Sequence, residues 1–195
     1  MRLFVALDID DSIRQRIAHF LKGVRGFAPA ARWVKGESLH VTLKFIGEKA
    51  ESEVQKIEQA LATISADSFE LSFRDYGFFP EAKAPRVFWI GSEGGSKLTL
   101  LANTVDETLA GLGIPKEEHA FKAHLTLARG GRGSGSPGKQ EGDRPNRSFE
   151  RLQEKLAAIP TPEFGTMTAR EFFLYQSLLS PGGSKYTKLA KLTLR

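Results

Sequence analysis

One four-residue pattern occurs twice in this chain, and it constrains the fold more than any other feature. The two copies are His40-Val41-Thr42-Leu43 and His124-Leu125-Thr126-Leu127. They lie 84 residues apart (positions 40 and 124), which is close to half of the 195-residue chain. Self-similarity at this spacing predicts an internal duplication into two related halves. Because the pattern occurs only twice, a repeat solenoid is not expected.

Each copy lies in a segment that alternates apolar and polar residues, as β-strands do. Residues 38–46 and 122–129 both show this alternation. Side chains two residues apart in a strand point the same way, so each strand presents its imidazole and its hydroxyl on one face. Strict alternation also puts Lys44 on the face of His40. Lys44 is therefore expected either to add positive potential to the site or to lie at the surface.

Paired histidines and threonines suit chemistry at phosphorus. An imidazole can give or take a proton near neutral pH, and a threonine hydroxyl can donate a hydrogen bond to a phosphoryl oxygen. Two such pairs facing a shared cleft would place an acid and a base on opposite sides of one phosphate, as in-line displacement requires. One copy alone would be read as a structural histidine on a sheet surface. Two copies predict catalytic His40 and His124, with Thr42 and Thr126 as substrate-binding residues.

The remaining segments alternate between strand and helix patterns. Further strands are expected at 2–8, 68–78, 86–91, 165–179 and 185–194, and helices at 11–25, 51–65, 97–112 and 148–159. Gly47 is expected to end the strand at 38–46. The pattern predicts an α+β fold, a bilobal pseudo-symmetric duplication with two antiparallel sheets flanked by helices around a central cleft. Residues 1–195 are expected to form one bilobal domain, with a flexible Gly-rich loop at about 130–148.

Composition narrows the chemistry. The chain has no cysteine, which excludes disulfides, thiolate nucleophiles and thiolate metal sites. It has no His-x-x-x-His spacing either, so we expect no metal site. Of its four histidines, His19 and His119 are expected to be structural or surface residues. The net charge of +5 favours a polyanionic partner such as nucleic acid.

The motifs resemble those of the 2H phosphoesterase superfamily, in particular its RNA 2′,3′-cyclic phosphodiesterase (2′-5′ RNA ligase) family. The similarity extends over nearly the whole chain. The residues that carry it are Arg2–Leu7, Arg32-Trp33-Val34, His40–Gly47, Phe121 and His124–Arg129. The Gly-rich insertion after Arg129 departs from the family pattern and leaves the shape of the cleft rim open.

This resemblance implies a metal-independent, cofactor-free opening of a 2′,3′-cyclic phosphate at an RNA 3′ end to a 2′-phosphomonoester. The resemblance implies that His40 protonates the leaving 3′ oxygen and that His124 activates the water. The pseudo-symmetry of the two motifs leaves the opposite assignment open. With an RNA 5′-hydroxyl in place of water, the reverse-type reaction would give ATP-independent 2′-5′ ligation. Arg129 takes the position of a phosphate clamp. Strict alternation puts Arg129 on the face opposite His124 and Thr126. Arg129 therefore reaches the cleft only if the strand ends or bulges near Gly130. Otherwise it is a surface arginine.

Two other functions remain open at this point. One is a noncatalytic RNA- or nucleotide-binding module. The other is a phosphodiesterase for small cyclic phosphates or 2′-5′ oligonucleotides. The expected partners are RNA 3′ ends or small cyclic phosphates, and the chain is expected to be a monomer. No stretch approaches the roughly 20 apolar residues of a membrane span, and Asp8, Asp10 and Asp11 interrupt the apolar N-terminal run. We therefore expect no membrane association and a cytoplasmic location.

Overall fold

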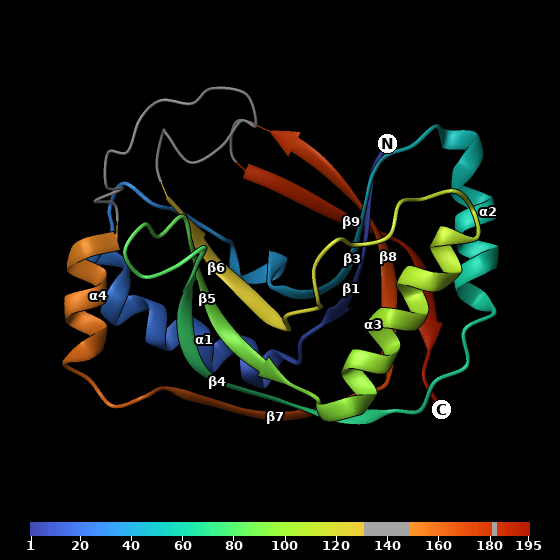
Figure 1. Ribbon diagram of the computed structural model, residues 1–195. Coiled ribbons are helices and arrows are strands. Elements are labelled where there is room, and N and C mark those ends of the chain that lie inside the picture. The colour runs from blue at the N-terminus through green and yellow to red at the C-terminus, as the bar shows by residue number, and fades with distance from the viewer. Residues whose placement is uncertain (131–148, 181–182) are drawn as a thin grey trace.

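The strands form a curled antiparallel sheet with helices at both of its ends (Figure 1). The computed structural model describes residues 1–130, 149–180 and 183–195. The strands are β1 (Arg2–Asp8), β2 (Arg32–Trp33), β3 (His40–Glu48), β4 (Phe69–Phe79), β5 (Val87–Glu93), β6 (His124–Arg129), β7 (Glu163–Ala169), β8 (Glu171–Ser180) and β9 (Gly183–Thr193). The α-helices are α1 (Asp11–Val24), α2 (Glu51–Ala62), α3 (Gly95–Ala110) and α4 (Glu150–Ala157), and Arg25–Phe27 and Gly36–Ser38 form 3₁₀ turns.

The strand order shows the duplication expected from the sequence. It runs β7-β4-β5-β6-β3-β1-β8-β9, and β2 pairs with β6 beside this path. The two histidine-bearing strands, β3 and β6, therefore lie together in the middle, and three strands extend outward from each. A single residue pair, Val41 with Leu125, joins them. The two predicted antiparallel sheets are present as the two halves of one sheet, and the predicted α+β fold is confirmed.

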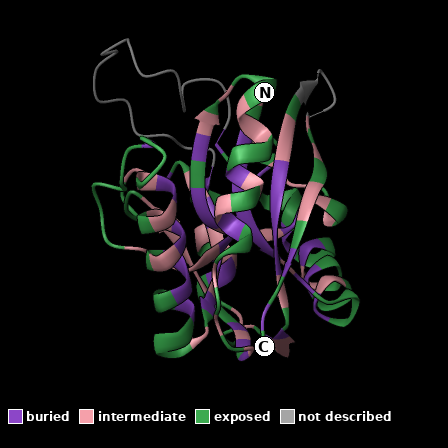
Figure 2. Cartoon of the chain, turned by 90° about the vertical axis from the view of Figure 1, so that its right-hand side faces the viewer, coloured by how far each residue is buried: buried purple, intermediate pink, exposed green. Residues whose placement is uncertain are grey.

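The helices bury their apolar faces against the outer side of this sheet. In α1, Ile13, Ile17, Leu21 and Val24 recur every three or four residues and are all buried. α1 packs against β7 and α4, whereas α2 and α3 pack against each other and against β9 and β3 (Figure 1). Buried residues follow the strands and the inward helix faces, and exposed residues follow the outer faces (Figure 2). Burying each large apolar side chain contributes about 1.5–3 kcal/mol, so this core holds the two halves together.

A second, smaller apolar cluster lies on the opposite face of β1 and β8. It consists of Phe4, Ala6, Phe173 and Tyr175, with Tyr186 of β9 packed against it. Leu3, Val5 and Leu7 alternate with its β1 members and belong to the main core. Both faces of β1 are therefore covered by side chains. This arrangement gives the face that carries His40 an aromatic floor.

One predicted strand is two strands in the structure. The segment 165–179 was expected to be continuous, but it divides at Arg170 into β7 and β8. β7 pairs with β4 in one half of the sheet, and β8 pairs with β1 in the other. The sequence around Arg170 contains neither Gly nor Pro. The break is decided by pairing with two different neighbours, which local patterning does not reveal.

Gly47 does not end its strand, contrary to the expectation from its type. β3 continues to Glu48, and Gly47 pairs with Leu3 at a φ of 87°. The register shifts between Leu3 and Phe4, so Gly47 belongs to a β-bulge. A positive φ costs glycine nothing, which lets the chain bend there without leaving the sheet.

The other predicted elements are present, with ends displaced by a few residues. The predicted flexible Gly-rich loop at about 130–148 lies outside the described residues except for Gly130. In the described part of the chain, no helix has the length and apolar character needed to cross a membrane.

Candidate active site

The four predicted histidines and threonines of the two motifs lie together at the centre of the sheet. β3 and β6 are antiparallel, and their only register pair is Val41 with Leu125. In this geometry His40 lies across from Thr126, and Thr42 lies across from His124, all on one face. Directly opposite Cβ atoms are about 5 Å apart and diagonal neighbours about 7–8 Å. The two imidazoles are diagonal neighbours, related by an approximate two-fold axis between Val41 and Leu125.

Both imidazoles are held in the same way. Nδ1 of His40 lies 2.7 Å from the carbonyl oxygen of Ser38, and Nδ1 of His124 lies 2.7 Å from that of Lys122. A carbonyl oxygen only accepts, so Nδ1 must carry the hydrogen in each ring. The neutral form of each histidine then has its lone pair on Nε2. Each half of the molecule thus presents one oriented nitrogen that can take or give a proton.

Burial keeps both histidines neutral near pH 7. It lowers the pKa of His40 from 6.5 to about 4, although the Ser38 carbonyl and the Asp8 carboxylate act to raise it. Burial also lowers the pKa of His124, and the Lys122 carbonyl acts in the opposite direction. The positive charge of Arg129 lowers both pKa values. Arg129 is therefore within electrostatic reach of both imidazoles.

A β-bulge brings Arg129 to the histidine face. Phe88 pairs with Ala128 and Trp89 with Thr126, so Leu127 is an extra residue in β6. Leu127 and Ala128 are both buried, and Arg129 emerges exposed on the face of His124 and Thr126. The extra residue, Leu127, lies three residues before Gly130, near which the sequence allowed a bulge. Of the two interpretations of Arg129, the structure favours a residue that faces the site.

β3 has the matching bulge, and it changes the positions of Lys44 and Phe45. Ala6 pairs with Thr42 and Val5 with Lys44, so Leu43 is the extra residue. Phe45 therefore joins the face of His40 and is 56% exposed, in the position that Arg129 occupies in the other half. Strict alternation would have put Phe45 on the face opposite His40, and that prediction was wrong from Lys44 onward.

Lys44 takes neither of its two predicted positions. Its side chain is 2% exposed, and Nζ lies 2.6 Å from the Asp106 carboxylate, 2.6 Å from the Pro115 carbonyl oxygen and 3.6 Å from Glu117. This buried ion pair fastens β3 to α3 and the loop that follows it. Lys44 lies on the core side, so it contributes no donor to the histidine face. The sequence could not show this because the bulge at Leu43 reverses the alternation.

Aromatic rings enclose both histidines. The ring centroid of His40 is 4.9 Å from that of Phe4 and 5.1 Å from that of Tyr186. The His124 centroid is 4.9 Å from Phe79 and 6.4 Å from Trp89. These rings cause much of the burial that lowers the histidine pKa values. Of the aromatic residues near the motifs in sequence, Trp33 and Phe78 instead pack on the main core.

A glycine makes room for the aromatic wall beside His124. Gly77 of β4 pairs with Trp89, and a Cβ on Gly77 would lie 2.1 Å from Cζ2 of that indole. Only glycine therefore lets the Trp89 ring lie flat against the neighbouring strand. The sequence contained Gly77 but no signal that it has this role.

Asp8 is a residue of the site that sequence reasoning missed. It pairs with His40 across β1 and β3 and shares its face. Its carboxylate lies 2.8 Å from Arg14 and 2.6 Å from Lys188. Burial acts to raise the pKa of Asp8, but the hydrogen bonds from Lys188 and the Ile9 N–H lower it, so Asp8 is ionised at neutral pH. The negative charge favours the protonated form of His40, and among the described residues no carboxylate acts on the pKa of His124 in the same way.

A cavity of about 520 Å³ opens beside His40. Its lining comes from β1, β3, β8, β9 and the turn before β3, and includes Asp8, Ser38, His40, Tyr175, Tyr186 and Lys188. His124 does not line it. Ligand pockets typically have volumes of about 300–1,000 Å³, so this cavity is large enough for a nucleoside.

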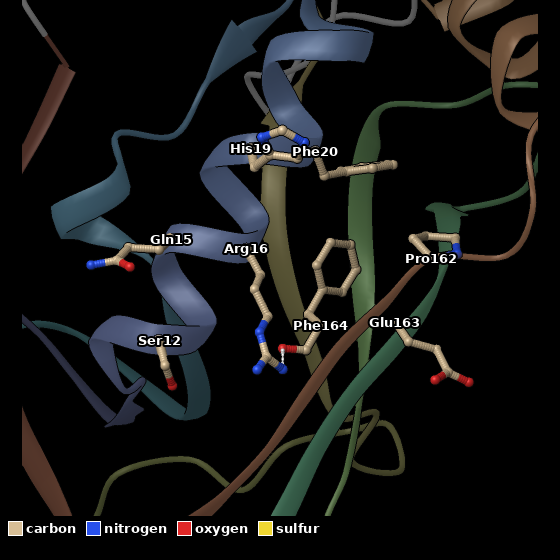
Figure 3. Close-up of a pocket in the computed structure, with 8 residues that line it drawn as sticks. All are labelled: Ser12, Gln15, Arg16, His19, Phe20, Pro162, Glu163 and Phe164. Carbon is tan, nitrogen blue, oxygen red and sulfur yellow. Dashed lines mark hydrogen bonds between the residues drawn. The ribbon is translucent and has the colours of Figure 1, made fainter.

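A larger cavity, of about 610 Å³, lies away from the motif strands between α1 and β7 (Figure 3). His19 lines it, and Arg16 donates a hydrogen bond to the Phe164 carbonyl oxygen across 3.2 Å. His19 and His119 are both exposed, as surface residues are expected to be. In the described ranges, no cluster of three or more His, Cys, Asp or Glu side chains is placed to bind a metal ion.

Comparison with known proteins connects this site to a family. The chain is 38% identical over 189 residues to an RNA 2′,3′-cyclic phosphodiesterase of Archaeoglobus fulgidus, covering 97% of this chain and 98% of that protein. It is 32% identical over 200 residues to the Aquifex aeolicus protein of the same name, covering 100% and 97%.

Solved structures agree with this relationship. Escherichia coli LigT complexed with 3′-AMP superposes with a TM-score of 0.76 at 28% identity, covering 99% of this chain and 97% of that one. The family model described as LigT like Phosphoesterase matches residues 7–89 and 90–186, so one histidine strand lies in each matched range. The chain therefore belongs to the LigT-like phosphoesterase family, within the 2H superfamily.

Proposed function

We propose that this protein hydrolyses the 2′,3′-cyclic phosphate at RNA 3′ ends to a 2′-phosphomonoester, by acid–base catalysis with two histidines and without a metal ion. The observation that carries the proposal is the pair of imidazoles on one sheet face, each with Nδ1 bound to a carbonyl and Nε2 available. The names of the relatives supply the substrate. One histidine comes from each half, so residues 1–195 act as one bilobal domain.

The reaction is an in-line displacement at phosphorus. One imidazole accepts a proton from water as the water oxygen bonds to phosphorus, and the other donates a proton to O3′ as the P–O3′ bond breaks. The product keeps its phosphate on O2′. Thr42 and Thr126 lie between the histidines on the same face, where their hydroxyls donate hydrogen bonds to the nonbridging oxygens. Arg129 adds a guanidinium to the same oxygens.

The asymmetry of the surroundings favours His40 as the acid. The cavity of about 520 Å³ is lined by His40 and not by His124, so the nucleoside lies on the His40 side. O3′ belongs to the ribose and therefore faces His40, and the water enters from the side of His124. Asp8 supports this assignment because its charge stabilises the imidazolium form of His40.

The histidine pKa values predict the pH dependence of turnover. Both lie below 6.5, so the free protein loses the required imidazolium as the pH rises. We expect kcat/KM, which reports the free protein, to fall about tenfold per unit above pH 6.5 and to fall again below about pH 4, where both rings are protonated. The negative charge of bound phosphate raises the pKa of both histidines in the complex. We therefore expect kcat, which reports the complex, to stay constant to higher pH than kcat/KM does. Steady-state kinetics from about pH 3 to 9 test both limbs of this profile, and a kcat/KM that stays level to pH 8 would contradict it.

A substrate panel in EDTA tests the proposed function. The panel contains nucleoside 2′,3′-cyclic phosphates, short RNA ending in a cyclic phosphate, and 2′-5′ linked dinucleotides, with products identified by phosphorus NMR. We expect 2′-phosphomonoesters from the first two. Binding without turnover would identify a noncatalytic module, and cleavage of the dinucleotides alone would identify a 2′-5′ phosphodiesterase. Adding RNA with a free 5′-hydroxyl shows whether 2′-5′ ligation accompanies hydrolysis.

A further inference from the structure

β2 places a second arginine directly beside Arg129. Arg32 pairs with Arg129 and Trp33 with Ala128, and the Val34 N–H donates to the Leu127 carbonyl oxygen across 2.8 Å. Residues directly opposite each other in antiparallel strands share a face, with Cβ atoms about 5 Å apart.

The orientation of β2 is independently defined by Trp33. Its ring lies 6.0 Å from that of Phe88 at an angle of 82°, and its Nε1 donates to the Ala28 carbonyl oxygen. Because Phe88 is fully buried, Trp33 faces the main core. Arg32, its neighbour in the strand, must therefore point to the opposite face, which is the face of His124, Thr126 and Arg129.

The two guanidinium groups have no carboxylate partner in the part of the chain that the structure describes. Arg32 and Arg129 are both exposed, and neither forms an ion pair with a described residue. The neighbour of Arg129 on its other side is Val87, which is uncharged. Like charges directly opposite each other destabilise a sheet, so this pair carries a cost that an anion would remove.

We propose that Arg32, together with Arg129, binds a second phosphate of the RNA strand, next to the cyclic phosphate held between the histidines. The inference rests on the proposed function and adds a residue that selects RNA over cyclic mononucleotides. Two adjacent guanidiniums offer paired N–H donors that match phosphate oxygens. Arg129 contacts both phosphates, and Arg32 lies one strand farther from the histidines. A nucleoside 2′,3′-cyclic phosphate has no second phosphate, so it gains nothing from Arg32.

The test compares Arg32→Gln with the wild type on two substrates, a nucleoside 2′,3′-cyclic phosphate and a short RNA ending in a 2′,3′-cyclic phosphate. We expect the ratio of kcat/KM for RNA to that for the mononucleotide to fall about tenfold, through KM. The slope of log KM against log salt for RNA should decrease by about 0.7, the value for one phosphate contact on a single strand. Arg32→Lys should restore the salt slope but only part of the kcat/KM ratio, because lysine keeps the positive charge but lacks the planar, bidentate N–H donors of arginine.

Arg195→Gln is the matched control, since it removes one exposed arginine from the far end of the molecule (Figure 1). It should leave the ratio and the salt slope unchanged. An equal loss on both substrates in Arg32→Gln, or no loss on either, would overturn the role of Arg32 while the proposed function stands. If the wild type turns over neither substrate, the proposed function itself fails.

Discussion

Asparagine in place of His124 is expected to lower kcat on a nucleoside 2′,3′-cyclic phosphate by about 10²–10⁴-fold, the usual contribution of a general acid or base. The same loss is expected for His40→Asn. The asparagine amide can still donate to the Lys122 or Ser38 carbonyl that now receives Nδ1–H, so the strand keeps its hydrogen bond. Only the proton-transferring Nε2 is lost. Steady-state assays of turnover in EDTA measure this loss of kcat.

The double variant and a third histidine make this test specific. Removing both imidazoles should cost little more than removing one, because residues that act as a unit do not contribute additively. His19→Asn is the matched control, since His19 is exposed on α1 away from the motif strands, and it should retain full activity. Thermal unfolding of all variants confirms that the fold is intact. Full activity in the double variant would eliminate the two-histidine mechanism.

Replacement of Arg129 by glutamine is expected to lower kcat/KM by about 10²–10³-fold on the same substrate. This is the typical cost of losing one donor that stabilises charge in a transition state at an acyl or phosphoryl centre. Arg129→Lys should recover part of the loss, because a lysine keeps the charge without the bidentate geometry. Arg195→Gln again serves as the control for removal of an exposed arginine.

The Arg129 variant also makes a prediction about pH that a purely structural role would not. The Arg129 charge lowers the pKa of both His40 and His124, so its removal must raise both values. The fall of kcat/KM with rising pH should then begin at higher pH than in the wild type, and NMR titration of the imidazoles should show the same shift. If the imidazole pKa values do not move, Arg129 does not lie beside them as the bulge in β6 requires.

Much of the site could be predicted because its signal is local. His40 with Thr42, and His124 with Thr126, share a face through simple strand alternation, and no bulge falls at the single residue between them. The duplication could be predicted because both halves contain the same His-x-Thr-Leu pattern. The helices could be predicted because their apolar residues, such as Ile13, Ile17 and Leu21 in α1, recur at the spacing of one helix face.

Alternation failed at the first residue beyond each motif, and for the same reason in both halves. An extra residue at Leu43 and at Leu127 reverses the faces that follow, which moves Lys44 into the core and brings Phe45 and Arg129 to the histidine face. A bulge is defined by the partner strand that it faces, so one strand's sequence does not reveal it. The sequence assigned Asp8 and Arg32 no role in the site for a similar reason, because their importance comes from the residues opposite them, His40 and Arg129.

The sequence by itself determined the two halves, the strands that carry the motifs and the residue types that can transfer a proton. These follow from periodicity and side-chain chemistry, which act over a few residues. Only the tertiary structure decided that β3 and β6 meet at Val41 and Leu125, that the bulges turn Arg129 toward both imidazoles, and that the cavity opens on the side of His40. Those features depend on contacts between segments far apart in the chain, such as Trp89 and Thr126 at a separation of 37 residues and Val41 and Leu125 at a separation of 84, where the free energy of packing and not local preference selects the register.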